Sequence, residues 1–185
     1  MRLRSIAGGL TGLALLAARA VAADPTPLAE HQIKALYLFN FTKYVDWPAA
    51  ATNAQPFVIG LAGAQDVKSD LAEIIKGKQL QGREIVIRPV ATPAELKGCH
   101  ILFIGDGNRQ RIGELLRAVQ GTAVLTVGEV EGFLTLGGMI NFTNQGNRVK
   151  LEIGLDNVQQ ARLNMSAKLL AVANVLRSRP ELPRK

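Results

Sequence analysis

The chain is short of the residues on which several kinds of protein depend. Its 185 residues include one cysteine, two histidines and one tryptophan. The lone cysteine, Cys99, excludes an internal disulfide, so packing alone must hold the fold together. The histidines, His31 and His100, have no second His, Cys or carboxylate at the spacing of metal ligands. We therefore expect no metal site.

The motifs of familiar catalytic and cofactor sites are missing as well. No Gly-x-Ser-x-Gly turn occurs. The run Gly105-Asp106-Gly107-Asn108 follows an expected strand and opens an expected helix, as a phosphate-binding turn would. Gln110, however, stands where the dinucleotide fingerprint needs a third glycine. We therefore expect no enzyme activity, no catalytic residue and no cofactor.

Apolar runs long enough to cross a membrane are also missing. The longest, Ile6 to Leu16, is far shorter than the roughly 20 residues of a span. Arg2 and Arg4 precede it and the small residues Ala20-Val21-Ala22 follow it. This order predicts a signal peptide over residues 1–22 that is cleaved near Ala22. The mature chain is then expected in the periplasm and not inserted in a membrane.

The excess of positive over negative charge is also modest. The chain has 22 Lys and Arg against 15 Asp and Glu, and loss of Arg2, Arg4 and Arg19 with the leader lowers the net charge from +7 to +4. The remaining basic residues are scattered or lie near the C-terminus. Because nucleic-acid binders gather basic residues on one face, we expect no nucleic-acid partner.

The mature length suits one domain. We place it at residues 23–179, followed by a short basic tail over residues 180–185 that we expect to be disordered. The domain begins with a helical pattern from Leu28 to Val45, which Trp47-Pro48 ends. Its predicted apolar face carries Ile33, Leu36, Tyr37, Phe41 and Tyr44, and Leu38 and Phe39 widen this stripe.

Short apolar runs then alternate with helical patterns, which is typical of a parallel sheet with crossover helices. Glu84 and Arg88 indicate that their strand lies nearer an edge of the sheet. The expected strands are 57–61, 84–90, 101–104 and 123–127, and the expected helices are 66–76, 92–97 and 108–120.

The pattern changes after residue 127. Two strand-like runs, 139–143 and 148–153, flank Asn144-Gln145-Gly146-Asn147, which predicts a hairpin. Apolar residues then recur at helical spacing after Asp156, which predicts one final helix that Asp156 caps and that ends near Leu176. The fold class is therefore α/β, with three layers, a mostly parallel sheet flanked by helices, and a C-terminal antiparallel β-hairpin.

Glycines follow several of the expected strands. Because ligands of open α/β sheets bind at the carboxyl ends of the strands, these glycines are candidates to line a crevice. They are equally ordinary at chain reversals, so both interpretations stay open. The candidates are Gly60, Gly63, Gly105, Gly107 and Gly128.

Four blocks together resemble the YfiR family of bacterial periplasmic proteins. They follow one another in the family's order along nearly all of the mature chain. The blocks are Lys34-Ala35-Leu36-Tyr37-Leu38-Phe39-Asn40-Phe41-Thr42-Lys43-Tyr44-Val45-Asp46-Trp47-Pro48, Val124-Leu125-Thr126-Val127-Gly128 with Gly137-Gly138-Met139-Ile140-Asn141-Phe142, Arg148-Val149-Lys150-Leu151-Glu152-Ile153, and 161–170.

The resemblance implies a periplasmic repressor that binds the periplasmic part of an inner-membrane diguanylate cyclase and holds down cyclic di-GMP synthesis. The chain departs from the family at Leu151 and Gly154, where Phe and Asn are common. It also lacks the cysteines that some members pair, which excludes redox control through an internal disulfide.

The candidates for contact with the partner lie on the hairpin and near the end of the first helix. They are Ile140, Phe142, Glu152, Phe41, Tyr44 and Trp47. Aromatic residues at helical spacing are also typical of a core, and a charged strand face is also typical of plain solvent exposure. A small-molecule sensor that uses the glycine crevice is the main alternative, a periplasmic enzyme is a weaker one, and the residues leave open whether a homodimer forms.

Overall fold

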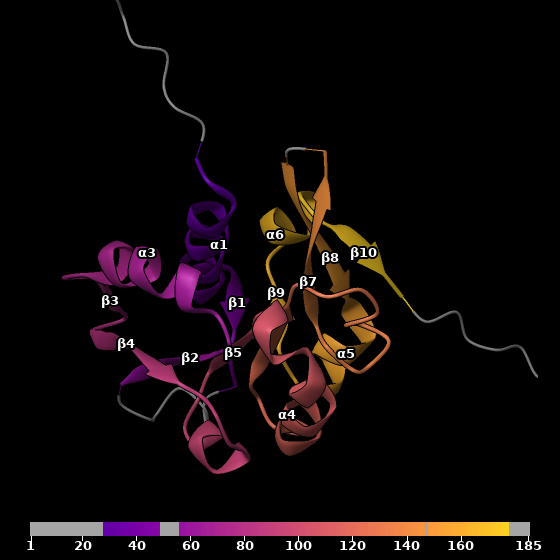
Figure 1. The fold of residues 1–185 in the computed structure, drawn as a ribbon, viewed down its shortest axis with the longest axis horizontal. Coiled ribbons are helices and arrows are strands. Elements are labelled where there is room, and N and C mark those ends of the chain that lie inside the picture. Colours follow the sequence, from indigo (N-terminus) through magenta and orange to yellow (C-terminus); the bar gives the residue numbers. More distant parts are fainter. Residues whose placement is uncertain (1–27, 49–55, 147, 178–185) are drawn as a thin grey trace, which may run out of the picture.

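Runs of aliphatic and aromatic residues form the strands of one eight-stranded sheet. The computed structural model describes residues 28–48, 56–146 and 148–177 (Figure 1). The strand order is β10-β8-β7-β6-β5-β2-β4-β3, and neighbours run parallel except β7–β8 and β3–β4. The strands are β2 (Phe57–Ala62), β3 (Gln79–Leu80), β4 (Arg83–Pro89), β5 (Ile101–Ile104), β6 (Leu125–Gly128), β7 (Ile140–Gln145), β8 (Arg148–Gly154) and β10 (Asn174–Leu176).

The strand predictions are confirmed within about two residues. β2 and β5 lie in the middle of the sheet and are buried along their whole length, as continuous apolar runs predict. β4 lies next to the edge strand β3. The hairpin is confirmed as well, although its turn is tighter than predicted. Asn144 and Gln145 pair with Val149 and Arg148 and so belong to the ladder.

Helices cover both faces of the sheet and produce the three layers. α1 (Glu30–Tyr44) and α3 (Gln65–Ile75) lie side by side over one face. The short 3₁₀ helices η1 (Pro93–Leu96) and η2 (Asp106–Arg111) lie close to α4 (Ile112–Val119), whose apolar residues pack on the other face. Each face has its own apolar cluster, one with Phe41 and Phe103 and one with Leu102 and Leu115.

The buried face of α1 overlaps the predicted stripe but is shifted toward Leu38 and Phe39. Leu36 and Tyr44 are 37% and 36% exposed, while Ala35, Leu38 and Phe41 are completely buried. The sheet therefore contacts the side of the helix that is centred on Leu38. The helix itself is confirmed, and the Ala29 N–H at its start donates a hydrogen bond of 3.0 Å to Gln32 Oε1.

The prediction of one final helix is wrong. The segment instead forms α5 (Leu155–Gln160), β9 (Asn164–Met165), α6 (Ala167–Ala171) and β10. Arg162 has φ of 57°, in the left-handed region that ends a helix. The N-cap position of α5 is Gly154, so Asp156 is not the cap that the sequence suggested.

After α5 ends, the chain pairs with a strand that is distant in the sequence. β9 pairs antiparallel with β1 (Val45–Asp46), directly after α1. Ser166 then caps α6, since its Oγ accepts a hydrogen bond of 3.3 Å from Leu169 N. The apolar residues of this segment therefore belong to several short elements and not to one helix.

None of the helices in the described ranges is long and apolar enough to span a membrane. The predicted leader, the start of the domain at residue 23 and the basic tail lie outside those ranges.

Candidate functional site

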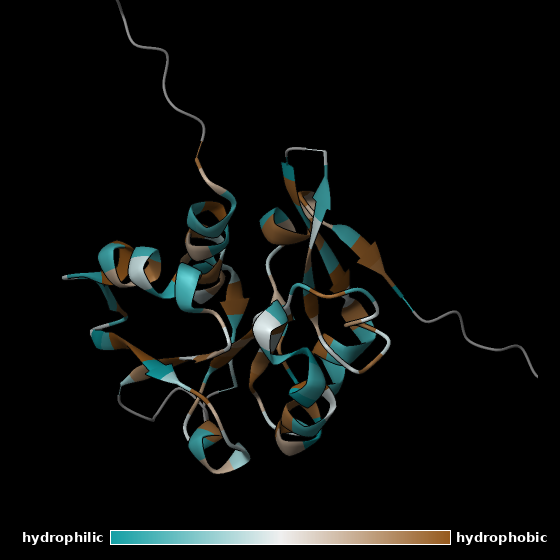
Figure 2. Cartoon of the chain, in the orientation of Figure 1, coloured by the Kyte–Doolittle hydropathy of each residue, from teal (hydrophilic) through white to brown (hydrophobic). Residues whose placement is uncertain are grey.

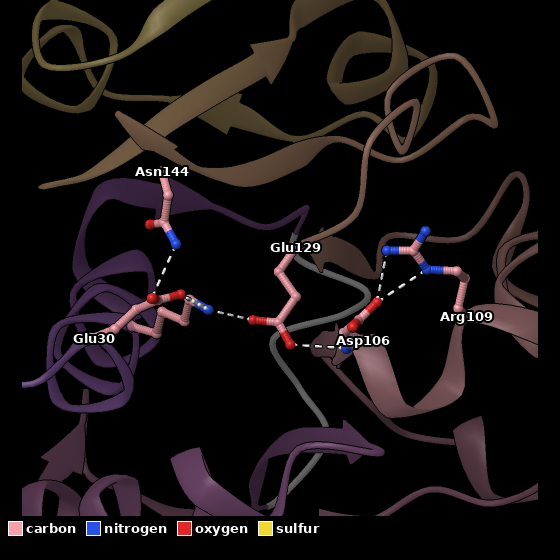
Figure 3. A network of polar contacts seen from close by, with 6 residues as sticks. Glu30, Asp106, Arg109, Glu129 and Asn144 are labelled. Atoms are coloured by element: carbon pink, nitrogen blue, oxygen red, sulfur yellow. Dashed lines mark hydrogen bonds and ion pairs between the residues drawn. The ribbon is translucent and has the colours of Figure 1, made fainter. Parts of the chain in front are cut away.

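A buried lysine forms ion pairs at the edge of the sheet where the parallel strands end. The Lys34 side chain on α1 is 9% exposed, and its ammonium lies 2.5 Å from Glu129 Oε2, just after β6. It also forms an ion pair with Glu30, one turn earlier on α1. The second oxygen of Glu129 accepts a 2.8 Å hydrogen bond from Asp106 N, at the end of β5. These contacts join α1 to the ends of two neighbouring strands (Figure 3).

The network continues to the hairpin. Asn144, near the carboxyl end of β7, donates a hydrogen bond of 2.9 Å to Glu30 Oε2. On the other side, the Asp106 carboxylate forms an ion pair of 2.8 Å with Arg109. Figure 3 shows these side chains as one chain of contacts from the hairpin to η2. The edge where open α/β sheets often hold a ligand is therefore bridged by the protein's own charged groups.

The pKa shifts follow from this packing. Burial opposes the charge of Lys34, but hydrogen bonds to Glu129 and Glu30 outweigh it and raise the pKa of Lys34. The hydrogen bond from Lys34 lowers the pKa of Glu30, and a further hydrogen bond from Asn144 acts in the same direction. Both groups are thus charged at neutral pH, and the network holds as an ion pair.

The candidate glycines lie where the chain approaches itself closely. A Cβ on Gly105 would lie 2.5 Å from the Gly63 carbonyl oxygen, and one on Gly128 would lie 2.5 Å from the Phe133 ring. Gly107 lies against the same Gly63 carbonyl, and Gly60 lies against Val90 and Cys99. Close packing explains these glycines, and their role in a ligand crevice stays a prediction.

Both histidines have partners in the protein. His31 Nδ1 lies 2.5 Å from Asp70 Oδ2 and ties α1 to α3. His100 is buried, and its Nδ1 accepts a hydrogen bond of 3.1 Å from Val58 N. In the described ranges, no group of three or more His, Cys, Asp or Glu is placed to hold a metal ion.

Three of the candidate contact residues belong to one hydrophobic core cluster. Phe41, Ile140 and Phe142 are at most 4% exposed. The rings of Phe41 and Phe142 stack with centroids 6.2 Å apart, and Phe103 meets Phe142 edge-on at 5.9 Å. These side chains cannot touch a partner while the fold is intact, so the structure places them beneath a surface and not on it.

Tyr44 and Trp47 lie near the end of α1. Trp47 is partly buried, since its ring meets Phe57 edge-on at 5.1 Å and its Nε1 donates to the His100 carbonyl at 3.2 Å. Tyr44 stays exposed, while its carbonyl accepts a hydrogen bond from Ser166 N. The structure therefore packs the Trp47 side chain against the same core cluster, while the Tyr44 side chain lies at the surface.

Glu152 lies in a row of polar side chains that crosses three strands. In register, Asn141 of β7 is opposite Glu152, and Glu152 is opposite Asn174 of β10. Residues opposite one another share a face of the sheet, and the core residues Leu151 and Ile153 lie on the other face. Asn141 is buried, Glu152 is half-buried and Asn174 is exposed. This polar row, Asn141–Glu152–Asn174, opens outward toward β10.

An exposed apolar patch lies close to the end of β10. Leu176 is 44% exposed and, with Leu134, lines an open hollow of about 390 Å³. Asn157 shapes this hollow, because its Nδ2 donates to the carbonyls of Leu134 at 3.0 Å and Gly138 at 2.6 Å. Sequence reasoning missed Asn157 and Leu176, since both fell inside the single helix that it expected. For Lys34 the sequence held one indication of an ion pair, because Glu30 precedes it by four residues in the helical segment.

Comparison with known proteins bears on family and fold. A family model described as YfiR/HmsC-like matches residues 31–174. No curated protein gave a match. Among solved structures, the chain is similar to an ABC domain of Streptococcus pneumonia in complex with L-Trp, with 10% identity over 78% of this chain and a TM-score of 0.51. It is also similar to a conserved domain protein from Vibrio cholerae O1 biovar El Tor, with 10% identity over 82% and a TM-score of 0.53.

At that identity the two structures support the α/β fold alone. The chain spans 59% and 61% of their lengths, about three fifths in each case.

Proposed function

The chain belongs to the YfiR/HmsC-like family, and on that premise we propose that it is a periplasmic regulator without catalytic activity. It binds the periplasmic part of a membrane-bound diguanylate cyclase and holds that enzyme in its inactive state. The observation that carries this proposal is the family match over residues 31–174, which covers nearly all of the described fold.

A physical constraint shapes the mechanism. A protein in the periplasm changes a cytoplasmic reaction only through a partner that crosses the membrane. To switch such a partner almost completely, the regulator must bind the inactive state more tightly than the active state by about 5.5 kcal/mol. That difference requires a specific contact surface, with a well-packed centre and a polar surround.

The end of the sheet near β10 has the composition of such a surface. Glu152 and Asn174 supply the exposed part of the polar row, and Leu176 supplies exposed apolar area at the neighbouring hollow. The buried Phe142 lies on the opposite face of the same hairpin and supports it from below. We propose that this region contacts the cyclase, with Glu152 as the charged contact.

The test compares cyclic di-GMP in cells with and without the gene. Deletion is expected to raise cyclic di-GMP, and the rise is expected to vanish when the cyclase is also removed. Restoring the intact gene is the matched control and is expected to return cyclic di-GMP to its starting level. If deletion leaves cyclic di-GMP unchanged while the cyclase is expressed, the proposed function is wrong.

A further inference from the structure

A groove lies between α1 and α3 at the surface of the protein. The two helices lie side by side, and the contact between His31 and Asp70 joins them next to this groove. Because that contact fixes the spacing of the helices, the groove is already formed in the free protein. Figure 2 shows that both helices carry hydrophobic and hydrophilic residues. The groove has a volume of about 230 Å³ and is lined by Leu28, Gln32, Leu36, Asp70, Glu73 and Ile74.

Large apolar side chains are exposed in this groove. Leu28, just before α1, is 54% exposed, Leu36 is 37% exposed, and Ile74 is half-buried. Leu28, Gln32 and Leu36 follow one another at steps of four, which places them on one side of the helical segment. We call Leu28, Leu36 and Ile74 the apolar strip. Exposed apolar side chains that gather in one groove, unlike single ones scattered over a surface, are typical of a contact with another molecule.

The side of the groove that α3 forms is acidic. Asp66, Asp70 and Glu73 follow at steps of four and three, so they form one acidic stripe along the helix. Lys68 lies two residues from each aspartate and therefore on the opposite side of α3. Asp70 contacts His31, whereas Glu73 is exposed and forms no ion pair within residues 28–48, 56–146 and 148–177. Negative charge therefore lies directly beside the apolar strip.

We propose that this α1–α3 groove binds an amphipathic helix of a partner protein. The apolar side of that helix packs on the apolar strip, and its lysine or arginine side chains face the acidic stripe. A helix laid in an apolar groove is a common mode of peptide recognition. From Leu28 to Leu36 the strip extends over roughly 12 Å at the rise of a helix. That length matches about two turns of a bound helix, with apolar residues at i, i+3, i+4 and i+7.

Charge selects a cationic helix over other occupants. A membrane surface that contains anionic lipids is negative, so the acidic stripe opposes its approach. An acidic helix is opposed in the same way. A cationic helix instead gains attraction along the stripe while its apolar side leaves water. Because the charges of the stripe are near the solvent, this attraction is expected to weaken as salt increases.

The α1–α3 groove is separate from the proposed contact with the cyclase. α1 and α3 pack on the face of the sheet that carries Leu151 and Ile153, whereas Glu152 lies on the other face. The two surfaces therefore do not overlap, and binding at the groove is measured without the cyclase.

Two synthetic peptides test the contact on the purified mature protein. Both are amphipathic helices with leucine at the same apolar positions, and the polar positions carry lysine in one and glutamate in the other. Fluorescence anisotropy of the labelled lysine peptide is expected to saturate as protein is added, with an affinity that falls as salt rises. The glutamate peptide is expected to show no saturable binding, because it meets the acidic stripe.

Two variants test the two parts of the groove. Leu36→Asp is expected to abolish binding of the lysine peptide, and Glu73→Lys is expected to weaken it about tenfold, because repulsion replaces attraction. The matched controls are Leu136→Asp, at a leucine that is 55% exposed, and Glu131→Lys, at an exposed position after β6. Both controls are expected to bind as the wild type does. Circular dichroism of all four variants checks that they fold.

Two results with the lysine peptide would overturn the inference. One is the lack of saturable binding at low salt, and the other is binding that Leu36→Asp and Glu73→Lys leave unchanged.

Two further measurements test the other occupants. Vesicles of phosphatidylethanolamine and phosphatidylglycerol test a membrane, and sedimentation over a range of concentrations tests a second copy of the chain. Vesicle binding that Leu36→Asp removes would assign the groove to a membrane, and self-association that Leu36→Asp removes would assign it to a second copy. Either result would refute the cationic helix as the occupant.

Discussion

The Lys34 ammonium and the Glu129 carboxylate lie 2.5 Å apart although 95 residues separate them in the chain. Lys34 is on α1 and Glu129 follows β6, so the pair fastens the first helix to the middle of the sheet. Glu129 also accepts the hydrogen bond from Asp106 N. One carboxylate thus fixes both the helix and the turn after β5.

Removal of the lysine charge is expected to destabilise the fold. Lys34→Met keeps most of the side-chain volume but leaves Glu129, 14% exposed, without its cation. Breaking a buried pair in this way costs about 3 kcal/mol in the free energy of unfolding. The double variant Lys34→Met/Glu129→Gln is expected to recover part of the loss, because it leaves no unpaired charge. Urea denaturation measures both, and equal losses in the single and double variants would contradict the coupling.

The network also predicts how stability depends on pH. The pKa of Glu30 is lowered from 4.5, so its contribution is complete above about pH 4.5 and disappears as pH falls through the lower native pKa. The pKa of Lys34 is raised from 10.5, so its contribution is complete below about pH 10.5 and disappears as pH rises through the higher native pKa. The difference in unfolding free energy between wild type and Lys34→Met should therefore be flat near neutral pH and shrink at both extremes. A difference that does not change with pH would refute this account.

Asn157 is expected to hold the loop that covers the hollow near β10. Asn157→Ala removes both hydrogen bonds to the carbonyls of Leu134 and Gly138, which costs about 1–2 kcal/mol. Proteolytic cleavage between residues 134 and 138 should become faster. Gln159→Ala, at an exposed position of the same helix, is the control and should change neither property. Unchanged cleavage in Asn157→Ala would show that the loop does not depend on this side chain.

Gly128 is expected to tolerate no side chain. A Cβ there would lie 2.5 Å from the ring of Phe133, which is completely buried and cannot move aside, so Gly128→Ala should cost about 2 kcal/mol. Gly113→Ala is the control. Its Cβ would lie 3.4 Å from the flexible end of Arg117, and alanine is the better helix former, so stability should rise by about 0.5 kcal/mol. Thermal unfolding measures both changes, and a neutral Gly128→Ala would contradict the packing.

Charge reversal at Glu152 is expected to weaken repression without unfolding the protein. Glu152→Lys changes a half-buried side chain on the polar row, whereas Leu151→Asp places a charge in the core and should unfold the domain. Glu84→Lys at an exposed position of β4 is the control for charge alone. Cyclic di-GMP is measured in a deletion strain that carries each variant. Full repression by a folded Glu152→Lys protein would remove Glu152 from the interface.

Local sequence patterns were sufficient to predict an element where its own residues determine its conformation and its buried faces. The runs at 57–61 and 101–104 predicted central strands because both faces of a central strand are covered. The turn signal between residues 143 and 148 predicted the hairpin, because the geometry of a tight turn depends on the residues within it. The position of Glu152 on the face opposite Leu151 and Ile153 followed from alternation along one strand.

Local patterns failed where a distant segment decided the structure. Apolar spacing from 158 to 176 is helical, but Arg162 adopts a left-handed conformation and the next residues pair with β1. Nothing near residue 162 encodes Val45 and Asp46 as partners. The burial of Phe41 and Phe142 was likewise decided by stacking between two elements about a hundred residues apart.

By itself, the sequence determined the fold class, the strands β2 and β4 to β8, the hairpin and the resemblance to a family, because these depend on residues close together in the chain or on blocks read in order. Only the tertiary structure decided that Lys34 meets Glu129, that three candidate contact residues lie in the core, and that β10 forms an open edge. Each of these depends on which elements become neighbours in space. That choice is made by the burial of the whole apolar surface and not by any one segment.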